Sequence, residues 1–372
     1  MTTIAGHLHR RTGDRVRRDG LHLRMTNRLH DICDDQGELA RQAQIARAIG
    51  SPFVADVLEA GQRQLTRAPR TAAMLVRWQG DPAAAAVAMR FNAALHALAR
   101  RDTPLALGAL YRREHRDFDG AIAAALAQHD AFVAAWMRDT PQTNEVGRAA
   151  SLVAALMTVR RAFDLPVELL ELGSSAGLNL NFHRYSYDLG GVIAGDPASS
   201  VRVAPEWRGA ALRPAALELI AARGADLHPL DPADPATCER LMAYVFADQP
   251  ARAGRLERAL GLARRHRPAI ERADAADWLA RQLTVPQPDG RCRVVFHSMV
   301  LQYVGAAARA RITDTIRRAG AAADKGRPLA WIGFEWTDDR SRVELRLTSW
   351  PGGTTRVLAT CHPYGAWIDW RG

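Results

Sequence analysis

A carboxylate and two glycines lie close together in the middle of the chain, within residues 167–180. Residues 167–172 are apolar enough for a buried parallel strand, and Gly173 and Gly177 enclose a turn of small residues. Such a turn lets a ligand approach the backbone, with the N–H groups of a following helix pointing at it. Glu171 places a carboxylate beside this opening. We therefore expect a ligand site here, although an ordinary strand-to-helix connection has the same pattern.

Further polar residues follow later strand-like segments. We expect strands at 226–230, 268–271, 293–297 and 329–335, and their alternation with helices predicts a parallel α/β sheet. Ligands bind beyond the carboxyl ends of such strands. The residues expected at those ends are Asp231, with Asp226 as second choice, then Asp274 with Ala275, His297 with Ser298, and finally Glu335.

This order of residues resembles class I S-adenosylmethionine-dependent methyltransferases, in which an acidic residue precedes a G-x-G-x-G turn. Ser175 replaces the middle glycine here. The resemblance implies S-adenosylmethionine as cofactor, with Asp231 or Asp226 on the ribose hydroxyls and Asp274 beside the adenine. The other residues implied at the cofactor are Glu171, Gly173, Ser174, Ser175, Gly177, Asn179, Ala275 and Ser298.

Two residues are candidates for catalysis. His297 could take a proton near neutral pH, and Glu335 could act as an acid in the pocket. The alternatives are a structural hydrogen bond for His297 and an ion pair for Glu335. Weaker candidates for substrate contacts are Asn144, Glu145, Gln302 and Tyr303. The first two could equally cap the helix expected at 146–162.

The remaining segments predict the domain organisation. Residues 37–140 have helical periodicity throughout and predict an all-α N-terminal domain, and residues 141–372 predict the α/β domain. Within it, helices are expected at 214–223 and 235–265, and strict alternation at 343–350 predicts a closing antiparallel hairpin. The expected fold is a Rossmann-like, mostly parallel sheet with this hairpin, preceded by helices.

Residues 1–36 are arginine-rich and predict a disordered basic tail, which could be a nucleic-acid arm or could precede a true start at Met25. The net charge is +10, and all 50 basic residues except Lys325 are arginine. Four scattered cysteines indicate neither a disulfide framework nor a metal site. Because no stretch could span a membrane, we expect a cytoplasmic protein. Its oligomeric state is left open.

Several runs also resemble an uncharacterised bacterial domain-of-unknown-function family. The longest are residues 141–148, 171–180, 224–231 and 296–303, together with 51–53 and 350–353. The resemblance implies a Rossmann-like S-adenosylmethionine-binding fold and no established substrate.

The first hypothesis is therefore a methyltransferase acting on a small molecule. The second is a non-catalytic protein of the same fold that binds S-adenosylmethionine, a nucleotide or a partner. Modification of RNA or DNA ranks third, because the basic residues are dispersed, and an NAD-dependent oxidoreductase is a lesser rival.

Overall fold

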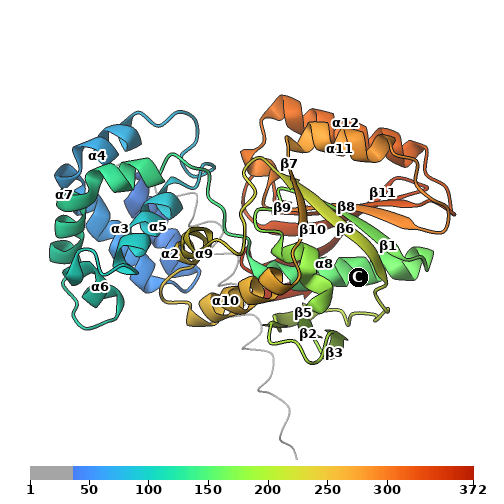
Figure 1. Ribbon diagram of the computed structural model, residues 1–372, viewed down its shortest axis with the longest axis horizontal. Coiled ribbons are helices and arrows are strands. Elements are labelled where there is room, and N and C mark those ends of the chain that lie inside the picture. Colours follow the sequence, from blue (N-terminus) through green and yellow to red (C-terminus); the bar gives the residue numbers. More distant parts are fainter. Residues whose placement is uncertain (1–36) are drawn as a thin grey trace, which may run out of the picture.

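The computed structural model describes residues 37–372, so the tail expected at 1–36 and the alternative start at Met25 lie outside this range. Figure 1 shows two lobes: helices from residues 38–136 form one, and a sheet with helices on both faces forms the other. None of the helices between residues 37 and 372 is long and apolar enough to cross a membrane.

The first lobe is entirely helical. Its elements are α2 (Glu38–Ala48), α3 (Pro52–Gln64), η1 (Leu65–Arg67), α4 (Pro69–Val76), α5 (Val87–Ala99), α6 (Leu105–Tyr111) and α7 (Phe118–Trp136). Prolines begin α3 and α4, where a missing N–H costs nothing. The core of this lobe contains Phe91 of α5 but also Tyr244 and Phe246 from far along the chain. The helices therefore share their core with the second lobe.

The second lobe is built on a mixed sheet of nine strands. In spatial order these are β5 (Glu206–Gly209), β12 (Trp367–Trp370), β11 (Thr354–Cys361), β10 (Val343–Trp350), β9 (Leu329–Trp336), β8 (Cys292–Ser298), β1 (Val167–Leu172), β6 (Leu219–Asp226) and β7 (Ala269–Arg272). Strands β9, β8, β1, β6 and β7 are parallel, whereas β10 and β11 form an antiparallel hairpin after β9. The carboxyl ends of the five parallel strands thus meet at one edge.

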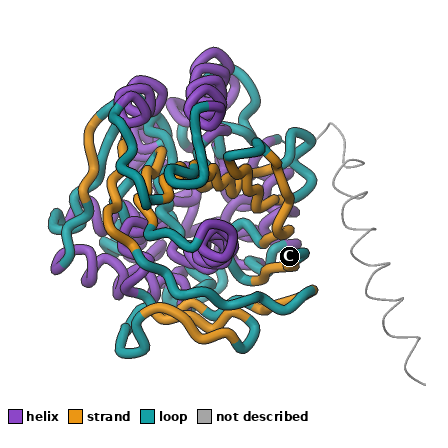
Figure 2. The backbone as a smooth tube through the Cα atoms, turned by 90° about the vertical axis from the view of Figure 1, so that its right-hand side faces the viewer, coloured by secondary structure: helices purple, strands orange, loops and turns teal. Residues whose placement is uncertain are grey.

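Helices cover both faces of the sheet (Figures 1 and 2). On one face, residues of α8 (Ala149–Phe163) and α10 (Pro250–Arg265) share an apolar core with Leu169 of β1. On the other face, residues of α11 (Ala275–Thr284) and α12 (Ala306–Ala321) share a core with Leu170 and Leu172. Burial on both faces explains why β1 is a continuous apolar run instead of an alternating one.

Three local predictions were wrong. Residues 219–226 form strand β6, where we expected a helix ending at 223 and a strand starting at 226. The alanine-rich segment forms a strand because it pairs with both β1 and β7. The helix expected at 235–265 is two, α9 (Pro235–Ala243) and α10. The glycine turn leads into the short 3-10 helix η3 (Leu178–Arg184) instead of an α-helix.

The remaining elements are small. Strands β2 (Ser186–Leu189), β3 (Val192–Gly195) and β4 (Arg202–Val203) form a separate three-stranded sheet. The short 3-10 helices η2 (Val146–Arg148) and η4 (Leu301–Tyr303) precede α8 and follow β8.

Candidate ligand-binding site

A cavity of about 1440 Å³ lies where the carboxyl edge of the sheet faces the helical lobe. Its sheet side is lined by many of the residues predicted from the sequence: Asn144, Glu145, Glu171, Gly173, Ser175, Asn179, Asp226, Asp274, Ala275, Ser298, Gln302 and Tyr303. Ser174, Gly177, Asp231, His297 and Glu335 do not line it. The helical side is largely apolar and includes Ile45, Ile49, Leu58 and Met89.

The glycine turn uses its own backbone N–H groups. All six N–H groups from residue 173 to residue 178 donate within the protein: 173 and 174 to Ala225 O, 175 to Asp226 Oδ2, 176 and 178 to Asn144 Oδ1, and 177 to Ser174 O. The expected row of N–H groups facing a ligand is therefore not present. A phosphate, which needs such donors, has no cradle in this turn.

The turn nevertheless requires left-handed backbone. Gly173 and Gly177 have φ of +68° and +67°, and Ser175, at the position of the missing glycine, adopts φ of +54°. The Ser175 hydroxyl donates to Gln142 at 2.7 Å. A Cβ on Gly173 would lie 2.6 Å from the Val300 side chain. Because Gly173 has no side chain, the loop after β8 can pack closely against the turn.

Glu171 and Asn179 form a buried polar pair in the cavity wall. Asn179 Nδ2 donates to Glu171 Oε1 at 3.1 Å. Burial raises the pKa of the Glu171 carboxyl to about 8, although hydrogen bonds from Asn179 and Ser174 oppose this. Glu171 Oε2 and Asn179 Oδ1 have no hydrogen-bond partner among the described residues. Two buried acceptors side by side suit a ligand that brings donors.

Asp226, not Asp231, closes strand β6 and reaches the cavity. Its carboxylate accepts from the N–H groups of Ser175 and His228, both at 2.8 Å. Asp231 lies five residues beyond the strand and accepts from Ala233 N in an exposed turn, so the first choice for the strand-end acid was wrong. Leu227, which follows Asp226, lines the cavity with 59% of its surface exposed.

Asp274 and Ala275 lie together after β7, as expected, and both line the cavity. Asp274 also caps α11, since its Oδ1 accepts from Ala276 N at 2.9 Å and from Asp277 N at 3.1 Å. One carboxylate oxygen of Asp274 therefore has a structural role that does not depend on a ligand.

His297 and Glu335 form a network beneath the cavity. His297 Nδ1 lies 2.7 Å from Glu335 Oε1, and its Nε2 accepts from Trp331 Nε1 at 3.0 Å. Glu335 Oε1 also accepts from the N–H groups of Val300 and Leu301. Because Nε2 accepts, Nδ1 must carry the proton, and His297 is a neutral, 1% exposed residue with both ring nitrogens engaged. The pair holds the loop after β8 in place.

Arg148 lines the cavity and was not predicted from the sequence as a site residue. It is only 7% exposed, and its Nε donates to Pro363 O at 2.8 Å. Its Nη1 lies 3.4 Å from both the carbonyl oxygen and the hydroxyl of Ser298, at the end of β8. Within residues 37–372 it forms no ion pair with a carboxylate. The available signal in the sequence was an arginine directly before a helix whose first turns are mostly apolar.

Glu145 pairs with two arginines of α10. It caps η2 by accepting from Gly147 N, and its carboxylate pairs with Arg252 at 2.6 Å and Arg255 at 3.8 Å. Burial alone would raise the pKa of Glu145, but the two arginines hold it below its ordinary value. The capping role considered for this residue is thus present together with its place in the cavity wall.

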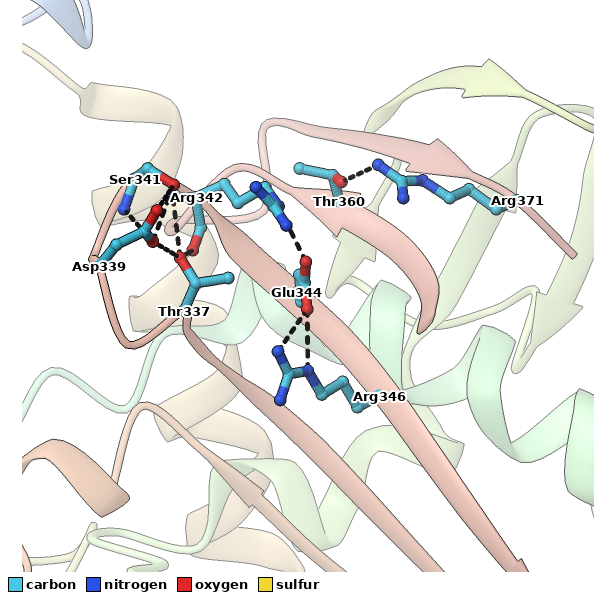
Figure 3. Close-up of polar contacts among 8 residues, drawn as sticks. All are labelled: Thr337, Asp339, Ser341, Arg342, Glu344, Arg346, Thr360 and Arg371. Atoms are coloured by element: carbon cyan, nitrogen blue, oxygen red, sulfur yellow. Dashed lines mark hydrogen bonds and ion pairs between the residues drawn. The ribbon is translucent and has the colours of Figure 1, made fainter. Parts of the chain in front are cut away.

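The far end of the cavity is bordered by the turn between β9 and β10. Figure 3 shows Asp339 bonded to Ser341 in this turn, and Glu344 of β10 between Arg342 and Arg346. Arg340, in the same turn, donates to Gln302 at 3.1 Å and lies 3.8 Å from Asp81 of the helical lobe. These contacts bring the two lobes together at the cavity edge.

The fold and cavity define an α/β protein with a large, mostly parallel central sheet and a ligand-sized cavity at its carboxyl edge. The chain belongs to the bacterial family described as "Uncharacterized protein conserved in bacteria (DUF2332)", which matches residues 36–370. A search of the curated proteins finds no match.

Proposed function

We propose that this protein is an S-adenosylmethionine-dependent methyltransferase that acts on a small molecule. The observation that carries the proposal is the set of carboxylates after three adjacent parallel strands, Glu171 on β1, Asp226 on β6 and Asp274 after β7, all in one cavity. The strand order β7-β6-β1-β8-β9 brings them together and supports the proposal, because these parallel strands run 3-2-1-4-5 when numbered along the chain, as in doubly wound sheets that bind nucleotides.

The residues present fit this cofactor. Each carboxylate oxygen of Asp226 accepts one backbone N–H, and its remaining lone pairs would accept the two ribose hydroxyls. Leu227 and Ala275 would offer apolar surface to the adenine, whose amine would reach Asp274. The unpartnered Asn179 Oδ1 would accept from the ammonium group of the methionine part, whose positive charge would favour the ionised form of Glu171 beside it. When bound, the cofactor supplies an electrophilic methyl group, and the protein contributes alignment and exclusion of water.

The turn also separates this proposal from a dinucleotide oxidoreductase. A dinucleotide brings a pyrophosphate, which binds free backbone N–H groups at a glycine turn. Here all six of those N–H groups are used internally. S-adenosylmethionine has no phosphate, and its single anionic group is the carboxylate of the methionine part, so a turn without free N–H groups disfavours it less than it disfavours a dinucleotide.

Titration calorimetry with S-adenosylhomocysteine and S-adenosylmethionine tests the proposal. We expect binding to the wild-type protein and a tenfold to hundredfold weaker affinity in Asp226→Asn, because hydrogen bonds to charged groups contribute about 1.5–3 kcal/mol. Asp231→Asn is the matched control, since Asp231 lies outside the cavity, and it should bind like wild type. Absence of binding to both compounds at high micromolar concentration would rule the function out.

A non-catalytic binding protein is the second candidate, because His297 is enclosed and cannot serve as an exposed base. It predicts the same calorimetry but no methylated product with any acceptor. Labelled methyl transfer assays on cell extracts therefore separate the two.

A further inference from the structure

The cavity next to the end of β8 contains a positive charge and lacks a base. Arg148 is buried beside Ser298, and its hydrogen bonds go to uncharged oxygen atoms of Pro363 and Ser298. A buried guanidinium without a carboxylate partner is costly unless a ligand brings the opposite charge. Arginine binds carboxylates in preference to neutral groups because its planar donors match them.

The groups nearest to this arginine are poor proton acceptors. His297 has both ring nitrogens engaged, and Glu335 Oε1 already accepts three hydrogen bonds. Tyr303 keeps its proton at neutral pH, as an ordinary tyrosine does. Burial lowers the pKa of His362 to about 4, so it is a weak base. Glu145 is paired with two arginines. A methyl acceptor that must lose a proton would therefore find no efficient general base near Arg148.

A carboxylate acceptor needs no general base. It is already ionised at neutral pH, so its oxygen can attack a methyl group without general base catalysis. The helical side of the cavity is largely apolar, with Ile45, Ile49, Leu58 and Met89, although Arg41, Gln42, Gln44, Asp81 and Asn92 also line it. A small molecule with an apolar body and one carboxylate satisfies both sides.

We propose that the methyl acceptor is a small apolar carboxylic acid, whose carboxylate binds Arg148 and itself takes the methyl group; this rests on the proposed methyltransferase function. A bond forms between one carboxylate oxygen and the methyl carbon. The bond from that carbon to sulfur breaks, its electron pair stays on the sulfur, and no proton is released. The product is a methyl ester, which has no charge to hold it at Arg148.

The test compares acids with their neutral amides on the full-length protein. Benzoate, phenylacetate, hexanoate and decanoate, and the amide of each, are titrated into protein saturated with S-adenosylhomocysteine, and the melting temperature and affinity are measured. We expect at least one acid to bind and its amide not to. Labelled S-adenosylmethionine should then give the methyl ester of that acid, detected by mass spectrometry.

Substitution of Arg148 links binding to this residue. Arg148→Gln should weaken acid binding at least about tenfold, the scale of one lost charge-assisted hydrogen bond, and leave the affinity for S-adenosylhomocysteine near wild type. Arg148→Lys should restore part of the acid affinity. Arg90→Gln is the matched control: Arg90 is also buried and bonded to carbonyl oxygens, but it does not line the cavity. It reports the cost of removing a buried arginine alone.

The outcomes distinguish the two proposals. If S-adenosylhomocysteine binds but no acid does, or if amides bind as well as acids, the carboxylate acceptor is overturned and the methyltransferase proposal stands. If Arg148→Gln weakens S-adenosylhomocysteine instead of the acid, the arginine serves the cofactor, and the acceptor proposal again fails. If S-adenosylhomocysteine does not bind at all, the methyltransferase proposal fails, and the acceptor proposal, which rests on it, fails with it.

Discussion

The position of Glu171 could be predicted from the sequence, whereas its protonation state could not. It was predicted from the sequence as the acid before a glycine turn, and it lies in the cavity wall. Its high pKa could not be predicted, because it depends on complete burial by residues distant in sequence. At neutral pH it is mainly a neutral carboxylic acid that can donate as well as accept.

This protonation predicts a pH-dependent stability. The pKa of Glu171 rises from 4.5 to about 8 on folding, so between these values the folded chain keeps a proton that the unfolded chain has lost. Stability then falls as pH rises through this window. Glu171→Gln should be more stable than wild type at pH 8, by about 1–3 kcal/mol, and similar at pH 5.

Chemical denaturation at the two pH values measures this difference. Glu257→Gln, on the exposed side of α10, is the control and should follow wild type at both. An equal effect of Glu171→Gln at pH 5 and pH 8 would show that Glu171 carries no proton in the folded protein.

The error at Asp231 also arose because tertiary contacts could not be predicted from the sequence. Both Asp226 and Asp231 follow a short apolar segment, and the sequence alone does not place the end of a strand within a few residues. The end of β6 is fixed by pairing with β1 and β7, which is a tertiary effect. Arg148 was missed for a related reason, since an arginine in a helix is usually exposed and only the fold buries it.

At the scale of elements, the loop after β8 is held in place by hydrogen bonds to strand β9. Glu335 of β9 accepts the N–H groups of Val300 and Leu301, and His297 and Trp331 complete the network. Both His297 and Glu335 were expected at strand ends, and both lie there. His297 makes the structural hydrogen bond considered as its alternative, whereas the partners of Glu335 are this neutral histidine and two backbone N–H groups instead of a charged group.

We therefore expect Glu335→Ala to loosen this loop. The variant leaves two backbone N–H groups and a ring N–H without partners, which costs about 1–3 kcal/mol for each buried group left unsatisfied. Hydrogen exchange at Val300 and Leu301 should become at least about tenfold faster, and the melting temperature should fall.

Glu344→Ala provides the control for this experiment. Glu344 lies opposite Glu335 in the register of β9 and β10 and is equally an acid on a strand, but its partners are the side chains of Arg342 and Arg346 (Figure 3). Its removal should leave exchange at residues 300 and 301 unchanged. Unchanged exchange in Glu335→Ala as well would show that the loop is held by packing alone.

At the scale of the whole molecule, the helical lobe and the sheet share one structure. The predicted succession of helices at 37–140 is present, but their core includes Tyr244, Phe246 and Tyr364. No periodicity in the sequence indicates that residues so distant complete this core. The mostly parallel sheet and the closing hairpin, by contrast, follow from local patterns and were predicted.

A chain of polar contacts joins the lobes beside the cavity. The Gln249 side chain donates to the Ser51 hydroxyl at 2.6 Å, at the start of α3, and Arg252 donates to Gln249. Arg252 in turn pairs with Glu145 and stacks 3.9 Å from the centre of the Tyr364 ring. Glu145 is the only carboxylate within ion-pair distance of Arg252 or Arg255 in the described part of the chain.

Glu145→Gln should therefore destabilise the whole molecule. The change leaves two mostly buried arginines without a negative partner, and breaking a buried pair in this way costs about 3–5 kcal/mol. Because the pKa of Glu145 is lowered in the folded protein, its contribution is present above the ordinary pKa of 4.5 and is lost as pH falls through the folded value. The deficit of the variant should thus be largest near pH 7 and shrink in acid.

Denaturant unfolding at pH 7 and at pH 3.5, followed by probes in both lobes, measures this effect. Glu271→Gln removes an exposed ion pair with Arg281 and should cost less than about 1 kcal/mol at either pH. If Glu145 holds the lobes together, its variant keeps a single transition at lower denaturant, because the shared core couples both lobes. A loss at pH 7 no larger than that of Glu271→Gln would mean that apolar packing alone joins them, and that the polar chain beside the cavity contributes nothing to stability.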